Sequence, residues 1–313
     1  MSKRGWLLFS TMSVIWGIPY LFIKVALEGV SAPFLVFSRT AIAAAILLPL
    51  ALRRGLVRPA LRAWRPLLAF TVLEIGLPWL FLNDAEQHIS SSVAGLLIAA
   101  VPLVGTLIVW RLGDHSALDR SRLLGLLVGI GGVAAVMGLD LGSASAPRMG
   151  EVLLVAIGYA TAPIIADRFL ADVPTLAVLA LALTTVAVAY LPAAAFTYPH
   201  AMPSGRSLAA ILVLGLVCTA AAFLLFFQLI AEIGPVRSTI ITFVNPAVAV
   251  VLGMIVLGEQ FTAGIAVGFP LIIVGCWLST RKSASEVPAE AAPEAVAVVG
   301  APAAADPVCE PAA

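Results

Sequence analysis

Long uncharged apolar segments, separated by short polar stretches, dominate the chain from residue 5 to residue 280. A bilayer core of about 30 Å needs roughly 20 apolar residues in helical form, so each segment is long enough to cross a membrane. The ten predicted spans are residues 5–26, 33–52, 66–83, 89–111, 122–139, 151–170, 174–196, 207–230, 236–257 and 262–280. We therefore predict an all-α integral membrane protein with ten transmembrane helices.

The second half of the chain repeats motifs of the first half at a shift of about 145 residues. The matching motifs are Ala85-Glu86 with Ala231-Glu232, Val101-Pro102 with Asn245-Pro246, and Leu112-Gly113-Asp114 with Leu257-Gly258-Glu259. Five spans per copy is an odd number, so the second copy should lie inverted in the membrane. We predict one five-helix repeat over residues 1–143 and a second, inverted one over 144–282. Many secondary transporters build a midplane site between such repeats.

The distribution of Lys and Arg predicts the orientation. With the N-terminus in the cytoplasm, fourteen of these residues fall on the inner side, against Lys24, Arg148 and Arg206 outside. Both termini then lie in the cytoplasm. Residues 283–313 are mostly Ala, Pro, Glu and Val without a period, so we expect a disordered cytoplasmic tail.

Composition narrows the class of protein further. The chain is 61% hydrophobic and 11% charged, too few charges for a soluble domain. A net charge of +1 gives no reason to expect a nucleic-acid partner. Three cysteines match no metal-binding or disulfide spacing, so no metal or cofactor is expected. These features favour a multi-pass protein of a bacterial cytoplasmic membrane, with the lipid bilayer as its surroundings and its oligomeric state unspecified.

Two charges inside predicted spans point to a function, because a charge at mid-membrane costs about 2.5–3.5 kcal/mol. Glu74 lies near the centre of the third span, and Pro78 leaves the carbonyl of residue 74 without its helical hydrogen bond. Arg39 lies inside the second span at a depth from which it could reach Glu74. We predict that both face one aqueous cavity and interact. Glu74 is a candidate site for a coupling proton or a substrate amine; the alternative is a structural ion pair.

Aromatic and amide side chains extend this candidate pathway. Trp16, Tyr20 and Lys24 recur at intervals of four and should share one helix face, lining either a cavity or the membrane interface. In the second half the candidates are Tyr159, Gln228 and Asn245. Proline pairs in matching helices, such as Pro19 with Pro163 and Pro102 with Pro246, indicate broken helices around a central site.

Charged residues near the span ends have simpler interpretations. Asp84, Glu86 and His88 alternate along the chain and do not share a helix face, so a solvated loop is favoured over a metal site. Glu86 and Glu259 are interpreted as charges that favour the N-terminal ends of the fourth and tenth helices. Glycines in the fifth and tenth spans, Gly129, Gly132 and Gly275 among them, predict close helix packing.

Several motifs resemble the EamA-like branch of the drug/metabolite transporter superfamily, over about residues 5–280. They are Trp16-Gly17 with Lys24, Ser38-Arg39, Ser90-Ser91-Ser92-Val93-Ala94, Val101-Pro102-Leu103, Leu112-Gly113-Asp114 and Val256-Leu257-Gly258-Glu259. The resemblance implies ten helices in two inverted repeats, a site between the repeats, and export or exchange of small metabolites. Asp114 stands where the family usually has Glu. Glu74 matches no family motif and depends on the membrane argument alone.

The leading prediction is a secondary transporter, an exporter or exchanger of amino-acid-like or amphiphilic organic compounds, with protons as a candidate coupling ion. No GxxxxGK[ST] loop supports a primary pump. The alternative is a membrane-embedded enzyme or lipid-handling protein. Catalysis of that kind needs a nucleophile–base pair or clustered acidic and His side chains, whereas His88, His115 and His200 are all in loops. We expect no enzymatic activity.

Overall fold

The computed structural model describes residues 2–113, 120–140, 146–234, 238 and 241–280, and every element assigned in these ranges is a helix. Three predicted features lie outside the described residues: the boundary between the two repeats, the C-terminal tail, and Asp114. Eight helical stretches in the described part are long and apolar enough to cross a membrane. They match the first eight predicted spans, and two shorter apolar helices stand where the ninth and tenth were predicted. The all-α membrane class is confirmed, and the total of ten spans stays a prediction.

The first half contains α-helices and one π-helical segment, η1. Their bounds are α1 (Lys3–Ile15), α2 (Pro19–Leu27), α3 (Ala32–Arg53), α4 (Val57–Arg62), α5 (Trp64–Thr71), η1 (Val72–Gly76), α6 (Leu77–Glu86), α7 (Ser91–Ile98), α8 (Val101–Arg111) and α9 (Arg120–Asp140). The second half contains a second π-helical segment, η4. Its elements are α10 (Ala146–Phe169), α11 (Thr175–Phe196), α12 (Gly205–Leu212), η4 (Val213–Ala221), α13 (Ala222–Ile233), α15 (Ile241–Leu257) and α16 (Ala263–Thr280).

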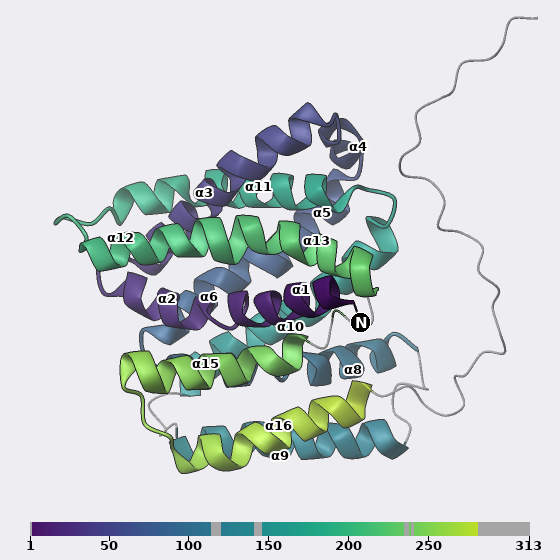
Figure 1. The fold of residues 1–313 in the computed structure, drawn as a ribbon, viewed down its shortest axis with the longest axis vertical. Helices are drawn as coiled ribbons and strands as arrows, with labels where there is room; N and C mark the ends of the chain where they lie inside the picture. The colour runs from purple at the N-terminus through teal and green to yellow at the C-terminus, as the bar shows by residue number, and fades with distance from the viewer. Residues whose placement is uncertain (1, 114–119, 141–145, 235–237, 239–240, 281–313) are drawn as a thin grey trace, which may run out of the picture. The chain divides into compact units, whose positions relative to one another are not determined.

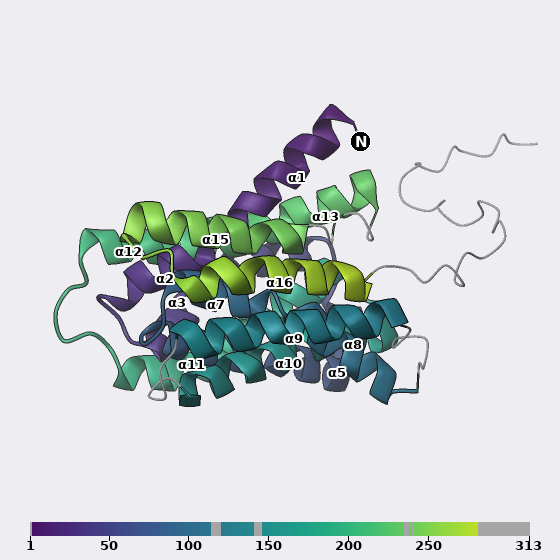
Figure 2. The same cartoon turned by 90° about the horizontal axis from the view of Figure 1, so that it is seen from below.

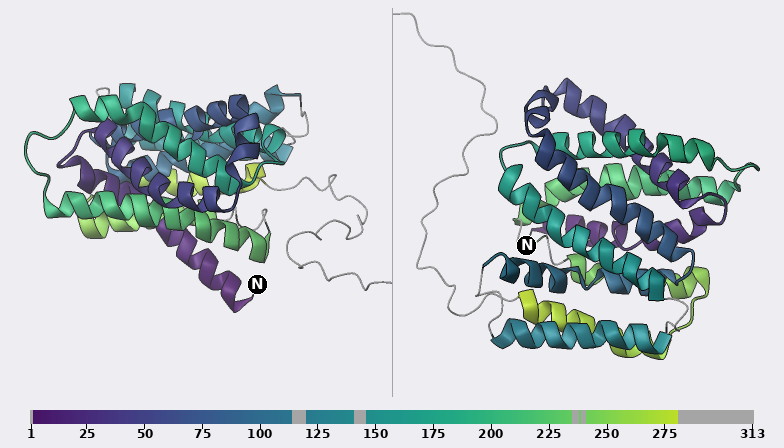
Figure 3. Two further views of the ribbon diagram at one scale, coloured as in Figure 1. Left: turned by 90° about the horizontal axis from the view of Figure 1, so that it is seen from above. Right: turned by 180° about the vertical axis from the view of Figure 1, so that it is seen from behind.

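Two spans of the first half are broken ahead of a proline. The first span is interrupted at residues 16–18, and α2 begins at Pro19. The fourth span is interrupted at residues 99–100, and Pro102 lies in the first turn of α8. Proline has no backbone N–H and is therefore best accommodated at a helix start. Because α1 ends at this break, it leaves the bundle at an angle, while α2 stays among the other helices (Figures 2 and 3).

The third and eighth spans each contain a π-helical segment. In the third span η1 separates α5 from α6, and in the eighth η4 separates α12 from α13. Pro78 would clash with the carbonyl of Glu74 in a regular α-helix, and the wider turn of η1 relieves this conflict. Such segments inside α-helices occur frequently at functional sites.

The outer helices pack in close pairs. α9 lies along α16 at one edge of the bundle, and α3 lies along α11 at the opposite edge (Figures 1 and 2). A Cβ atom at Gly275 would lie 2.4 Å from the Cα of Gly129, and one at Gly132 would lie 2.8 Å from the backbone nitrogen of Ile272. The predicted close packing through glycine is confirmed, because a larger residue at these positions would separate the helices.

Candidate functional site

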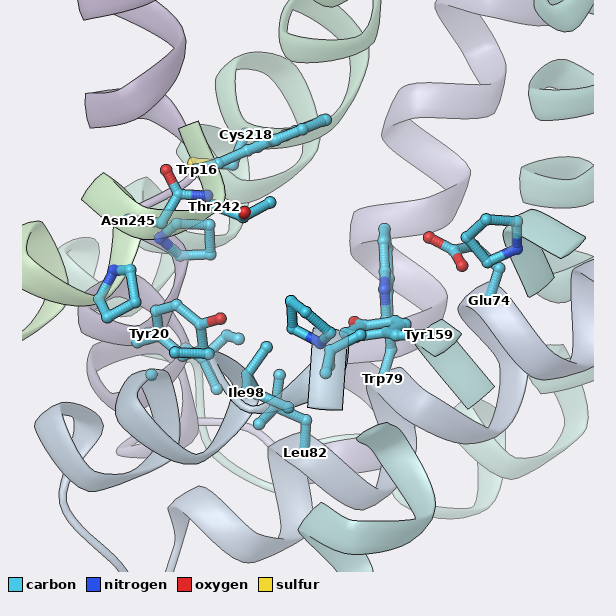
Figure 4. Close-up of a pocket in the computed structure, with 18 of the residues that line it drawn as sticks. Trp16, Tyr20, Glu74, Trp79, Leu82, Ile98, Tyr159, Cys218, Thr242 and Asn245 are labelled. Atoms are coloured by element: carbon cyan, nitrogen blue, oxygen red, sulfur yellow. The ribbon is translucent and has the colours of Figure 1, made fainter. Parts of the chain in front are cut away.

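A cavity of about 380 Å³ lies among helices of both halves, within the size range of small-molecule sites (Figure 4). Seven of the predicted spans contribute to its wall. The lining residues are Trp16, Pro19, Tyr20, Ile23, Arg39, Glu74, Trp79, Leu82, Gly95, Ile98, Ala99, Val101, Pro102, Tyr159, Pro163, Cys218, Phe223, Thr242, Asn245 and Pro246. Six of the eight candidate site residues meet here: Trp16, Tyr20, Arg39, Glu74, Tyr159 and Asn245.

All four paired prolines line this cavity. Pro19 and Pro102 follow the two helix breaks, while Pro163 lies inside α10 and Pro246 inside α15. The π-helical segments reach the same space through Glu74 and Cys218. The irregular parts of both halves therefore converge on one place. Non-helical backbone at membrane depth is tolerated only where it is buried in protein or lines a cavity.

Trp16, Tyr20, Thr242 and Asn245 form one side of the cavity (Figure 4). The indole of Trp16 packs with a centroid distance of 4.6 Å to Phe226, in α13. With its amide oriented to satisfy the surrounding carbonyls, Asn245 donates from Nδ2 to Ser13 O at 3.1 Å and Ile241 O at 2.9 Å. These contacts connect the broken first span to α15.

Trp79, Tyr159 and Glu74 lie across the cavity from Tyr20 and Asn245 (Figure 4). α10 approaches this wall closely at Gly158, where a Cβ atom would lie 2.4 Å from Leu73 O in η1. Oε2 of Glu74 is buried, and no described residue offers it a hydrogen bond. A carboxylate oxygen in such surroundings needs a proton, a water molecule or a ligand.

Arg39 is 8% exposed and is held by two side chains. Its guanidinium carbon lies 3.8 Å from the ring centroid of Trp79. Nε donates to Oγ1 of Thr219 at 2.9 Å, and that hydroxyl donates to Leu214 O at 2.8 Å. The predicted contact between Arg39 and Glu74 is absent: both line the cavity, but among the described ion pairs none joins them. The guanidinium instead stacks on Trp79 and bonds to Thr219, so it does not pair with Glu74.

The other two candidates, Lys24 and Gln228, lie outside the cavity wall. Nζ of Lys24 donates to the carbonyls of Glu86 at 2.5 Å and Ile89 at 2.8 Å. The expected common face of Trp16, Tyr20 and Lys24 assumed a continuous helix, whereas this span is interrupted at residues 16–18. Gln228 is exposed and accepts from Nη2 of Arg4 at 3.5 Å.

The acidic residues near the span ends differ from their sequence interpretation. Glu86 is fully buried in the last turn of α6, with no hydrogen-bond partner for its carboxylate among the described residues, so it belongs to no solvated loop. Asp84 forms an ion pair with Arg148. His88, by contrast, is exposed, and its Nδ1 lies 3.1 Å from Asp84 O. In the described part of the chain, no group of three or more His, Cys, Asp or Glu side chains is placed to hold a metal ion.

Glu259 caps a helix of the other half, not the helix that follows it. Its carboxylate accepts from the backbone N–H groups of Ser91 at 2.7 Å and Ser92 at 3.0 Å, and from the Ser92 hydroxyl at 2.5 Å. These donors begin α7, so Glu259 stabilises the fourth span, whereas Thr262 accepts from Ile265 N at the start of α16. The interpretation of Glu86 and Glu259 as charges at the starts of the fourth and tenth helices was wrong.

Sequence reasoning missed three functional candidates: Trp79 and Thr242 line the cavity, and Thr219 holds the side chain of Arg39. Trp79 follows Glu74 by little more than one helical turn, and this spacing could have placed it near the same cavity. Thr219 and Thr242 lie in apolar runs, where a single hydroxyl can bond to its own helix and gives no warning of a longer-range role.

Proteins that are similar to this chain in sequence carry transporter names. The profile of the EamA-like transporter family matches the chain twice, over residues 3–138 and 150–281. A protein of Streptantibioticus cattleyicolor named a probable terminal-alkyne amino-acid exporter is 28% identical over 290 residues, covering 90% of this chain and 95% of that protein.

Two further relatives carry transporter names. An uncharacterized transporter of Archaeoglobus fulgidus is 24% identical, covering 90% of this chain and 99% of that protein. The uncharacterized inner membrane transporter YedA of Escherichia coli is 26% identical, covering 80% of this chain and 81% of that protein. A solved crystal structure of a protein aligns with a TM-score of 0.62 at 22% identity, covering 90% of this chain and 98% of that one. At this identity the solved structure supports the fold alone.

Proposed function

Since the chain belongs to the EamA-like transporter family and is a multi-pass membrane transporter, we propose that it exports or exchanges amino-acid-like or amphiphilic organic metabolites through the central cavity. Transport would proceed by alternating access, as the two inverted repeats rock around the cavity. The observation that carries this proposal is the convergence of four repeat-related prolines and both π-helical segments on one cavity. The printed name of the Streptantibioticus relative supports an amino-acid-like substrate.

The proposed setting is a bacterial cytoplasmic membrane with both termini on the inner side. The inner-membrane name of the Escherichia coli relative supports this setting. The alternative, a membrane enzyme or lipid-handling protein, gains no support from the family or from the names of the relatives.

Protons are the proposed coupling ion, with Glu74 as the residue that carries them. Glu74 combines a position on the cavity wall with a buried carboxylate oxygen that has no partner among the described residues. Its place in η1, next to the start of α6 at Leu77, puts it on a segment whose backbone is already irregular. A group that binds a proton in one state and releases it in another suits such a segment, because a small rotation changes its access to water.

The test is transport by purified protein in liposomes that contain a pH-sensitive dye. Pools of labelled amino acids and organic amines would be added to vesicles with wild-type protein, Glu74→Gln or Glu28→Gln. Glu28, an exposed residue that caps α2, is the matched control. We expect substrate-dependent proton flux in the wild type and the control, and its loss in Glu74→Gln.

Two other results would change the interpretation. Equal movement of labelled substrate without proton flux in all three proteins would indicate a uniporter or exchanger and leave Glu74 with a structural role. Failure of every tested pool to move through the wild type would argue against amino-acid-like substrates.

A further inference from the structure

Arg39 is fixed in one orientation by side chains from both halves. Trp79 stacks under the guanidinium plane at 3.8 Å, and Thr219 accepts from Nε at 2.9 Å. Stacking fixes the plane of the group, and the bond to Nε fixes its rotation within that plane. Thr219 is itself fully buried and is anchored to Leu214 O across the wider turn of η4. The guanidinium is therefore preorganised, and a ligand would not have to order it.

The charge of Arg39 has no acidic partner in the described structure. Glu74 shares the cavity, and Glu86 is buried in the next part of the third span, yet neither forms an ion pair with Arg39. Among the described residues, Thr219 is the one hydrogen-bond acceptor for this side chain. A buried cation that forms no direct ion pair is expensive in a membrane, so its persistence at the cavity wall requires a purpose.

The free edge of the guanidinium specifies the chemistry of its ligand. With Nε occupied, Nη1 and Nη2 remain as a pair of parallel donors, and no described residue accepts from either. This two-donor edge matches the two oxygens of a carboxylate. We infer that Arg39 is the specificity-determining residue of the cavity and binds the carboxylate of the transported compound.

The remaining wall describes the rest of the compound. Trp16, Tyr20, Tyr159 and Phe223 give the cavity an aromatic surface. Organic carboxylates with an aromatic or aliphatic body would be favoured over amines that lack the acid group. This inference rests on the proposed transport function and adds to it the group on which selection depends.

The test compares each acid with its carboxamide, in which a neutral amide of nearly the same shape replaces the carboxylate. The probes are L-phenylalanine, L-leucine and L-glutamine with their amides, together with 3-phenylpropanoate and phenethylamine. Binding to purified protein in detergent is measured by calorimetry, independently of transport. We expect the wild type to bind the preferred acid about 10- to 100-fold more tightly than its amide, as hydrogen bonds to a charged group imply.

Three variants separate a role in binding from a role in folding. Arg39→Gln should abolish the preference for the acid. In Thr219→Val the new side chain has nearly the shape of threonine, and Arg39 keeps its charge, but Nε of Arg39 loses its acceptor. The preference for the acid over its amide should therefore fall several-fold. Thr184→Val is the matched control, because its hydroxyl donates only to Ala180 O within α11 and lies away from the cavity. It should retain the wild-type preference.

Some results would overturn the inference. These are equal binding of acids and amides by the wild type, no binding of any acid, or an undiminished acid preference in folded Arg39→Gln. If Arg39→Gln does not fold, the result for Thr219→Val is decisive. An acid preference in Thr219→Val equal to that in Thr184→Val would contradict the inference. If acids bind in an Arg39-dependent way but the protein in liposomes does not transport them, the binding site is upheld and the proposed function is contradicted. If amines are transported and Arg39→Gln does not change this transport, the proposed function is upheld and the binding site is contradicted.

Discussion

Arg39 and Glu259 are charged residues that connect the two halves of the chain. Arg39 belongs to the first half and bonds to Thr219 of the second, while Glu259 belongs to the second half and caps α7 of the first. Each side chain bonds to groups far away in sequence. The two contacts differ in purpose: Glu259 has three donors around its carboxylate, whereas Arg39 lines the cavity and keeps two donors without an acceptor among the described residues. The first arrangement is suited to stability and the second to binding.

Replacement of Glu259 tests the cap across the two halves. Glu259→Ala leaves the N–H groups of Ser91 and Ser92 without this acceptor at the start of α7, and the free energy of unfolding should fall by about 1–2 kcal/mol. Unfolding by SDS in mixed micelles measures this change. Gln260→Ala, at the exposed neighbouring position, is the control and should leave stability unchanged. An equal effect of the two replacements would show that the cap adds nothing.

The sequence located Arg39 and Glu74 because a charge within an apolar run is costly and therefore conspicuous. It did not locate Trp79 or Thr219, because an indole or a hydroxyl in a membrane helix is common and has several inexpensive roles. The predicted pairing of Arg39 with Glu74 failed for a related reason. Depth in the membrane was readable, but the rotation of each helix about its own axis was not.

At the scale of elements, the broken spans and the π-helical spans all line the cavity, whereas internal prolines also occur in the edge helices α3, α11 and α16. The first and fourth spans are broken, the third and eighth contain π-helical segments, and the sixth and ninth contain an internal proline. The edge helices α9 and α16 instead pack through glycine. The positions of the prolines indicated the breaks, because proline has no backbone N–H to donate within a helix. No residue type indicates a π-helical turn in the same way, so η4 was not predictable from its sequence.

Substitution of a packing glycine tests the contact between α9 and α16. In Gly275→Ala the new methyl group would lie within 2.4 Å of backbone atoms of Gly129, so the two helices must separate and stability should fall by about 1–3 kcal/mol. Gly131→Ala, on α9, adds a methyl group with no atom within 4 Å and should be neutral or stabilising by up to about 1 kcal/mol. Thermal unfolding in detergent compares the two, and equal midpoints would contradict the packing.

At the scale of the whole molecule, the cavity exists because segments from both halves face one another. Polar contacts between the halves lie near the predicted outer ends of the spans. Arg148 pairs with Asp84 there, and the Ser31 hydroxyl donates to Thr197 Oγ1 at 2.8 Å. At the predicted inner end, Ser2 donates to Glu232 at 2.5 Å. Under the proposed mechanism, these are the contacts that must break and re-form as access alternates.

Thiol labelling tests the orientation that the Lys and Arg distribution predicts. In a cysteine-free background, His200→Cys should react with a membrane-impermeant maleimide in intact cells, because its loop is exposed and predicted to lie outside. Arg62→Cys, in the exposed α4, should react only after the membrane is permeabilised. The opposite pattern would invert the proposed topology, and labelling of both in intact cells would contradict one fixed orientation.

The sequence by itself determined the membrane class, the positions of the first eight spans and the charges that a bilayer does not tolerate without reason. These properties depend on local composition and helical period, which each segment carries alone. Tertiary structure decided that Glu259 caps α7, that Lys24 binds backbone carbonyls, and that Arg39 stacks on Trp79 instead of meeting Glu74. Such outcomes depend on where each helix breaks and how it is rotated against its neighbours. Packing among many helices determines both, and no single segment contains that information.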